Sequence, residues 1–215
     1  MWYIPVSKRF RGSSRAIASQ FLRPKRVAIF EACLIGLVCG LAGVSLKLGV
    51  GWLGSWRLSA ALIVPAWLLL PSVGLIGGLL TGLLVERLAP ETAGSGIPHV
   101  KAALAGVGLP LNFRVAIVKL IGTILAVGSG LTLGRQGPTV QIGASLAAWI
   151  SNGIPTSPEY RRQLIACGAA AGLAAGFNAP IAGVLFVVEE LLHDVSGLTL
   201  GTAIISSFIL SLIHI

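Results

Sequence analysis

The stretch Gly134-Arg-Gln-Gly-Pro-Thr-Val-Gln-Ile-Gly143 (GRQGPTVQIG) interrupts an otherwise apolar part of the chain. Its Arg135 is the only charged side chain between residues 120 and 158. Glycine permits extended or left-handed backbone, and proline is favoured in the first turn of a helix, where its missing N–H costs nothing. The stretch therefore predicts a loop that leads into the N-terminus of an apolar helix.

The same pattern occurs at two other places in the chain. Gly94-Ser-Gly-Ile-Pro98 and Gly176-Phe-Asn-Ala-Pro180 also place a glycine four residues before a proline, with apolar sequence after it. The free N–H groups of a first helical turn carry partial positive charge, so two or three converging ends make an anion site without a full cation. Ser95 adds a hydroxyl donor and Gln136 an amide donor. A single break is ordinary helix punctuation, but three with matched spacing favour an anion-binding function.

The composition indicates that these breaks lie in a membrane. Of the 215 residues, 55% are hydrophobic and only 11% are charged, whereas soluble domains carry roughly 25% charged residues. Residues 58–85, 136–158 and 163–188 contain no charge, and about 20 such residues are enough to span a bilayer. Irregular backbone at that depth is tolerated only in packed protein or beside a wet cavity. We predict an all-α, multi-pass integral membrane protein with tilted and broken transmembrane helices, surrounded by membrane lipid.

The net charge of +9 is concentrated before the first expected span. Seven of the 16 Lys and Arg residues lie in residues 1–26, which is the pattern of a cytoplasmic flank and argues against a nucleic-acid partner. We therefore predict a basic cytoplasmic N-terminal segment at 1–26 and a transmembrane unit at 27–215. The three cysteines match no metal-site spacing. No nucleophile–base pair, phosphate loop or metal-ligand cluster indicates an enzyme, a metal or a cofactor.

The hydrophobic pattern and its breakers predict the individual helices. Helices are expected at residues 27–53, 60–87, 111–129, 136–150, 158–176 and 180–190, with a short apolar piece ending near 108 and a last apolar segment. Pro71 is expected to kink the second helix or to mark its true start. Ser157 is expected to cap the helix that begins at Pro158. Glycines four residues apart predict close helix packing at Gly36/Gly40, Gly74/Gly78/Gly82 and Gly168/Gly172/Gly176.

Three blocks, taken together, resemble the CLC family of chloride channels and chloride/proton exchangers. They are GSGIP, GRxGPTVQIG and GAAAGLAAGFNAPIAGVLFVVEEL, in that order, and the resemblance covers about residue 27 to the C-terminus. It implies the first inverted-repeat half of a CLC-type fold, a homodimer with one pore per subunit, and chloride as the transported ion. It also implies that the Ser95 hydroxyl and the amides around Gly137 bind the anion. The implied filter residues are Gly94, Ser95, Gly96, Ile97, Pro98, Gly134, Arg135, Gln136, Gly137 and Pro138. For Arg135 itself, pairing or snorkelling is favoured over direct contact with the anion.

The chain departs from the family pattern at the gate position. Gln136 stands where the family normally has a glutamate whose carboxylate competes with chloride and carries protons, and an amide does not titrate. We therefore expect chloride-selective transport, by a voltage-gated channel or an exchanger subunit, that is uncoupled from protons or only weakly coupled to them. Glu190 matches the internal proton-transfer glutamate of exchangers, and its alternative reading is a solvated carboxylate at a helix end. His99 is either a vestibule residue or a proton-related one.

The second departure is length. The family's second half supplies another filter helix and a central tyrosine, but no GKFIP-like block follows here, and neither Tyr3 nor Tyr160 lies where that tyrosine would be. An alternative is therefore a non-transporting fragment, or a regulatory partial subunit, that needs a complementary half. Another selectivity, such as nitrate or fluoride, shares the fold; by the family resemblance, Ser95 favours chloride.

Overall fold

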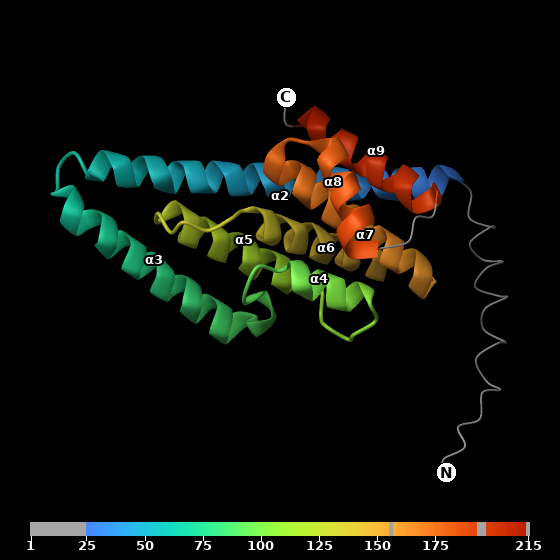
Figure 1. The fold of residues 1–215 in the computed structure, drawn as a ribbon, viewed down its shortest axis with the longest axis horizontal. Helices are drawn as coiled ribbons and strands as arrows, with labels where there is room; N and C mark the ends of the chain where they lie inside the picture. Colours follow the sequence, from blue (N-terminus) through green and yellow to red (C-terminus); the bar gives the residue numbers. More distant parts are fainter. Residues whose placement is uncertain (1–24, 155–156, 193–196, 214–215) are drawn as a thin grey trace, which may run out of the picture.

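The chain folds as a set of helices in this computed structural model, which describes residues 25–154, 157–192 and 197–213 (Figure 1). No β-strand occurs in those ranges. Helix α2 (Lys25–Ala60) runs the length of the molecule, and α3 (Ala66–Leu88) diverges from it after a short turn. Both are long and apolar enough to cross a membrane. The 36 residues of α2 extend about 54 Å, which exceeds a hydrocarbon core of about 30 Å, so the helix tilts or projects beyond it.

The other helices are shorter, and most of them pack against α2. They are α4 (Ile97–Leu104), α5 (Phe113–Gly128), α6 (Gln136–Asn152), α7 (Pro158–Phe177), α8 (Pro180–Phe186) and α9 (Gly197–Ile213). The Ser157 side chain accepts the N–H of Tyr160 and caps α7, which confirms the predicted start of that helix. Figure 1 shows α5 between α2 and α3, α6 between α2 and α4, and α7 to α9 gathered near the start of α2. Residues 1–24, most of the predicted basic segment, lie outside the described residues.

Two expected boundaries are wrong at the first hairpin. α2 continues to Ala60 instead of ending at 53, because residues 54–60 contain no proline and extend the helix without interruption. The next helix starts at Ala66 instead of 60, directly after Pro65. Pro71 lies inside α3 and neither starts nor ends it, so the helix accommodates the loss of one backbone donor. The expected helix over 180–190 is also divided, since α8 gives way to a π-helical stretch at Val187–Leu192.

The core is densest where α6 crosses α7, and glycine makes that crossing possible. A Cβ on Gly143 would overlap the carbonyl oxygen of Gly168, and one on Gly172 would overlap the carbonyl oxygen of Thr139. Helix backbones that approach this closely leave no room for a side chain. Gly36 of α2 meets Ser206 of α9 in the same way, with its Cβ position 2.5 Å from the carbonyl oxygen. Close packing is therefore confirmed for Gly36 and for the run Gly168/Gly172/Gly176.

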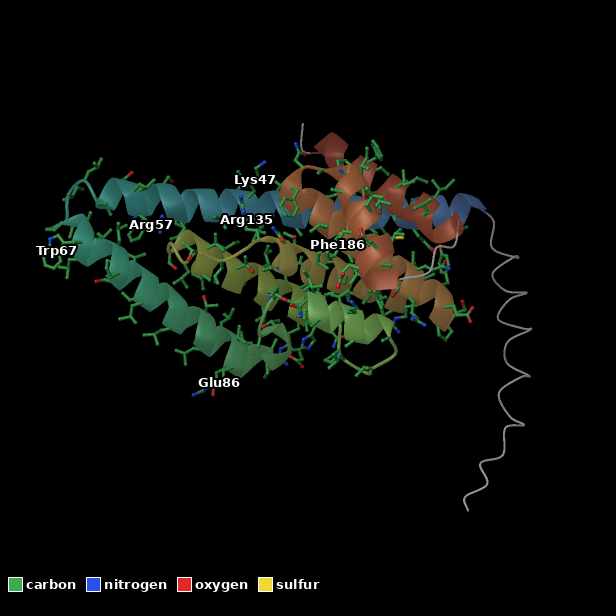
Figure 2. The ribbon with its side chains drawn as sticks, viewed as in Figure 1. Lys47, Arg57, Trp67, Glu86, Arg135 and Phe186 are labelled. Carbon is green, nitrogen blue, oxygen red and sulfur yellow. The ribbon has the colours of Figure 1, made fainter. Side chains whose placement is uncertain are left out.

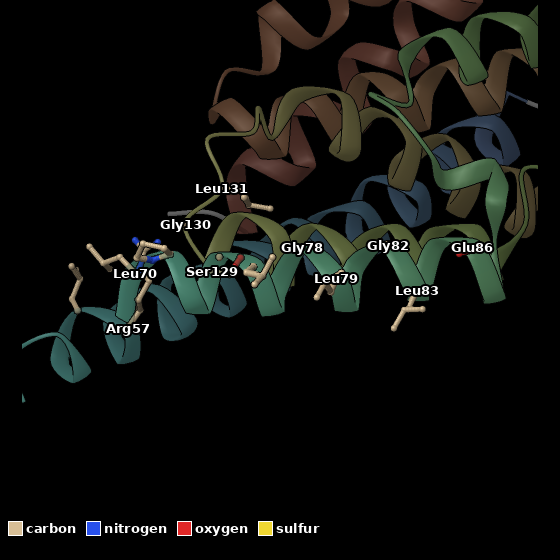
Figure 3. Close-up of a pocket in the computed structure, with 14 residues that line it drawn as sticks. Arg57, Leu70, Gly78, Leu79, Gly82, Leu83, Glu86, Ser129, Gly130 and Leu131 are labelled. Atoms are coloured by element: carbon tan, nitrogen blue, oxygen red, sulfur yellow. The ribbon is translucent and has the colours of Figure 1, made fainter. Parts of the chain in front are cut away.

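The third glycine run does not pack. A Cβ on Gly82 would meet no atom within 4 Å, and one on Gly78 would reach only Leu131 at 3.7 Å. Together with Gly74 they line an open groove of about 940 Å³ between α3, the end of α2 and the end of α5 (Figure 3). The glycine of α3 that is buried is Gly77, which contacts Ser129. The prediction for this run is wrong because α5 approaches α3 through Gly77, on another face of the helix.

Candidate functional site

Two of the three predicted loop-to-helix breaks open onto one cavity. It has a volume of about 690 Å³. Gly94, Ser95 and Ile97 line it from the first break; Gly134, Gln136, Gly137 and Pro138 line it from the second. α4 and α6 therefore begin at the same place, while α3 and α5 supply the remaining walls.

The two breaks touch through their backbones. A Cβ on Gly137 would overlap the carbonyl oxygen of Ser95, so only glycine fits there. Gly96, the N-cap of α4, has a φ of 95°, and a Cβ on it would lie 2.7 Å from Oε1 of Gln141. A left-handed backbone and this crowding both require glycine at Gly96. The glycines of both motifs thus serve the contact between the two loops.

Backbone donors at the start of α6 remain available at this cavity. The Thr139 amide bonds the carbonyl oxygen of Arg135 at 3.1 Å, and Pro138 has no N–H. The amides of Gln136 and Gly137 therefore have no acceptor within the helix. α4 begins in the same way, since the first intrahelical bond runs from Val100 N to the Gly96 carbonyl oxygen at 3.1 Å. Two helix starts with unused donors, together with the Ser95 hydroxyl, form an arrangement suited to a small anion.

Lys119 is a residue of this cavity that the sequence analysis missed. It is only 6% exposed, and its Nζ donates to the carbonyl oxygens of Thr92 and Gly94, each at 2.7 Å. It thereby fixes the loop that carries Ser95 and places a positive charge in the wall of the cavity. The available signal was a single lysine inside the apolar span 115–129, because an ionisable residue at membrane depth is a functional candidate by default.

Gln141 of α6 holds the same loop from the other side. Its side chain is fully buried, and its Nε2 donates to the carbonyl oxygen of Glu91 at 3.0 Å. Irregular backbone inside a membrane needs such partners because water does not supply them. Side chains from α5 and α6 together therefore hold the first break in its shape.

The third break does not join the cavity. Asn178 ends α7 in a left-handed conformation with φ 56°. Gly176 and Asn178 line a separate cavity of about 190 Å³. The sequence predicted that two or three breaks converge, and two do. The third stays apart because Gly172 packs on Thr139 and carries the end of α7 to the other side of α6. Arg135 also lines this second cavity and does not line the first.

Glu190 lies away from both cavities. Its Oε1 is 2.9 Å from Nζ of Lys101, on α4, and both side chains are about half exposed. The position agrees with the reading of Glu190 as a solvated carboxylate, and a proton-transfer role stays a hypothesis. His99 is half-buried on α4.

Comparison with known proteins identifies the family. The sequence profile described as voltage gated chloride channel matches residues 77–214, which is more than half of the chain. The chain belongs to this CLC family. The H(+)/Cl(−) exchange transporters ClcA of Salmonella schwarzengrund and Salmonella typhimurium are each 42% identical to it over 192 residues. That match covers 86% of this chain and 40% of theirs, so the chain spans about two fifths of the length of these relatives.

Solved CLC structures share the fold. A slow cyanobacterial Cl−/H+ antiporter superposes with a TM-score of 0.82 at 34% identity, over 89% of this chain and 46% of its own. A eukaryotic CLC transporter gives a TM-score of 0.80 at 26% identity, over 87% of this chain and 37% of its own. The predicted all-α, partial CLC-type fold and the integral membrane class are confirmed. The division at residue 26, the cytoplasmic N-terminus and the roles of the filter residues stay predictions.

Proposed function

We propose that this chain carries an anion filter for chloride transport, and that the flux is not coupled to protons at position 136. The observation that carries the proposal is the meeting of the GSGIP break and the α6 N-terminus at one cavity. The proposed anion ligands are the Ser95 hydroxyl and the amides at Gln136 and Gly137. The names of the ClcA relatives and of the cyanobacterial antiporter support chloride as the ion.

The chemistry of the cavity suits passage better than tight binding. First-turn amides present about half a positive charge, which replaces part of the hydration of chloride without a full ion pair. Lys119 adds a charge whose donors are partly engaged by the Thr92 and Gly94 carbonyls. Among the residues that the structure describes, no carboxylate lines this cavity, so none of them competes with the anion.

The uncoupling rests on Gln136. Its side chain lies at the cavity and offers an amide, which donates a hydrogen bond but neither binds nor releases a proton near neutral pH. Glu190 is the other proposed proton carrier, and its half-exposed carboxylate pairs with Lys101 and does not line the filter cavity. Both features favour passive chloride movement over exchange.

Chloride efflux from liposomes that contain the purified chain, with external pH recorded at the same time, tests the proposal. We expect chloride release without an opposing proton movement. Stoichiometric proton uptake during release would overturn the uncoupling. A chain that gives no release, either alone or with a complementary half, would overturn transport itself.

A second function is favoured by the extent of the match. The chain covers 40% of the ClcA relatives, and the filter motifs of one half build only part of an anion site. In this alternative, the chain is a partial or regulatory subunit that conducts only with a complementary half. A homodimer with one pore per subunit is the assembly expected if the complete site forms.

A further inference from the structure

The cavity beside Gly176 and Asn178 is lined by two positively charged side chains. Lys47 of α2 and Arg135, the residue before α6, both line its volume of about 190 Å³, together with Thr139 and Asn178 (Figure 2). No Asp or Glu among the described residues lines it. In the described part of the chain, neither Lys47 nor Arg135 forms a salt bridge. Both exposed side chains line the same small cavity, so an anion that enters it would be attracted by two positive charges.

We propose that this cavity is a second anion-binding site, which takes a small inorganic monoanion such as chloride. Lys47 supplies a point charge, Arg135 a planar set of N–H donors, and the Asn178 amide a neutral donor. A single water occupies about 30 Å³ of liquid, so 190 Å³ admits one anion with a few waters. Large organic anions exceed that space.

The second site and the filter cavity share the first turn of α6. Arg135 lines one cavity, and the next residue, Gln136, lines the other. Thr139 also lines the second cavity, and its Oγ1 donates to the carbonyl oxygen of Gln136 at 2.8 Å. An anion held by Lys47 and Arg135 would therefore wait beside the filter and raise the local anion concentration. This consequence rests on the proposed transport function, whereas the binding itself does not.

Binding is tested by thermal unfolding of the full chain in detergent, at constant ionic strength, as potassium chloride replaces potassium gluconate. Chloride bound to the folded state raises Tm. We expect Lys47→Gln to lose part of the chloride-dependent rise and Lys47→Arg to retain it. Arg114→Gln is the matched control, because Arg114 is an exposed arginine in the first turn of α5 and lines neither cavity. Arg114→Gln should show the same chloride-dependent rise in Tm as the unmodified chain.

Several results would overturn the second site. One is a chloride-dependent rise in Tm that is as large in Lys47→Gln as in the unmodified chain. Another is an equal loss of that rise in Arg114→Gln. The third is a Tm of the unmodified chain that does not change with chloride. A Lys47-dependent rise with phosphatidylglycerol in the micelles, but not with chloride, would identify a lipid phosphate as the occupant and also overturn it.

The effect on flux separates this inference from the transport proposal. In liposomes, we expect Lys47→Gln to increase the half-saturating chloride concentration by about 2- to 5-fold at low ionic strength, with the difference lost near 1 M salt. If chloride raises Tm through Lys47 but the chain never transports chloride, only the transport proposal is refuted. If the chain transports chloride but Tm shows no chloride-dependent rise that requires Lys47, only the second site is refuted.

Discussion

Gln136 and its neighbour Gly137 serve the cavity in different ways. Gln136 exposes a side chain that cannot ionise, whereas Gly137 is required because the Ser95 carbonyl oxygen occupies the space of any Cβ. Lys119 differs from both, since it acts through two backbone carbonyls of another segment. These three positions carry the chemistry of the candidate filter.

Gln136→Glu should make chloride flux depend on pH. The new carboxylate would compete with the anion when charged and withdraw when protonated, so flux should rise as pH falls through the pKa of that group. Liposome efflux measured from about pH 8 to about pH 4 brackets the usual range of a glutamate pKa. Gln136→Asn is the uncharged control and should stay flat. The same flux at every pH in Gln136→Glu would refute the assignment of this position as the gate.

Lys119→Met should loosen the loop that carries Ser95. The substitution leaves the carbonyls of Thr92 and Gly94 without their donor, and an unpaired buried group such as the Thr92 carbonyl costs about 1–3 kcal/mol. We expect lower thermal stability and reduced chloride efflux.

Lys101→Met provides the comparison for Lys119→Met. It removes only the half-exposed pair with Glu190, which contributes at most about 1 kcal/mol. Equal loss of stability in the two variants would contradict a special role for Lys119.

Among the helices, the crossing of α6 and α7 orients the candidate site. Gly143, Gly168 and Gly172 bring the two backbones together, and this sets where α6 begins relative to the end of α7. The glycines of α3 have the same spacing but face an open groove (Figure 3). Spacing alone therefore does not distinguish a packing face from an unoccupied one.

Gly172→Ala and Gly82→Ala should differ in sign. A Cβ on Gly172 would overlap the Thr139 carbonyl oxygen and force the helices apart, which costs about 1–3 kcal/mol in an overpacked core. A Cβ on Gly82 meets nothing, and alanine favours a helix over glycine by about 1 kcal/mol. Thermal unfolding of the two variants measures both effects. A destabilised Gly82→Ala with an unaffected Gly172→Ala would show that the crossing is wrongly placed.

The molecule as a whole leaves much of its apolar surface uncovered. α3 has a single buried residue, Gly77, and the groove beside it has a volume of about 940 Å³. Lipid or further protein would cover such a surface in a membrane.

Co-expression with the remaining, C-terminal part of Salmonella typhimurium ClcA should give a co-purifying complex. We expect chloride efflux from that complex to exceed efflux from the chain alone, because the second half would supply the rest of the anion site. An unrelated membrane protein of similar size is the control for co-purification. Separate elution of the two parts, together with full activity of the chain alone, would reject the partial-subunit reading.

Local sequence was sufficient to identify the class of protein, the loop-to-helix breaks and the cap at Ser157. These features depend on the conformational preferences of Gly, Pro and Ser within a few residues, and on the hydrophobicity of each span. Packing between distant segments settled the rest. It brought two breaks together and kept the third apart, directed Lys119 to Gly94, placed Arg135 and Lys47 at one cavity and left Gly74, Gly78 and Gly82 facing an open groove. Such contacts depend on how whole helices cross, and no single stretch of sequence encodes that.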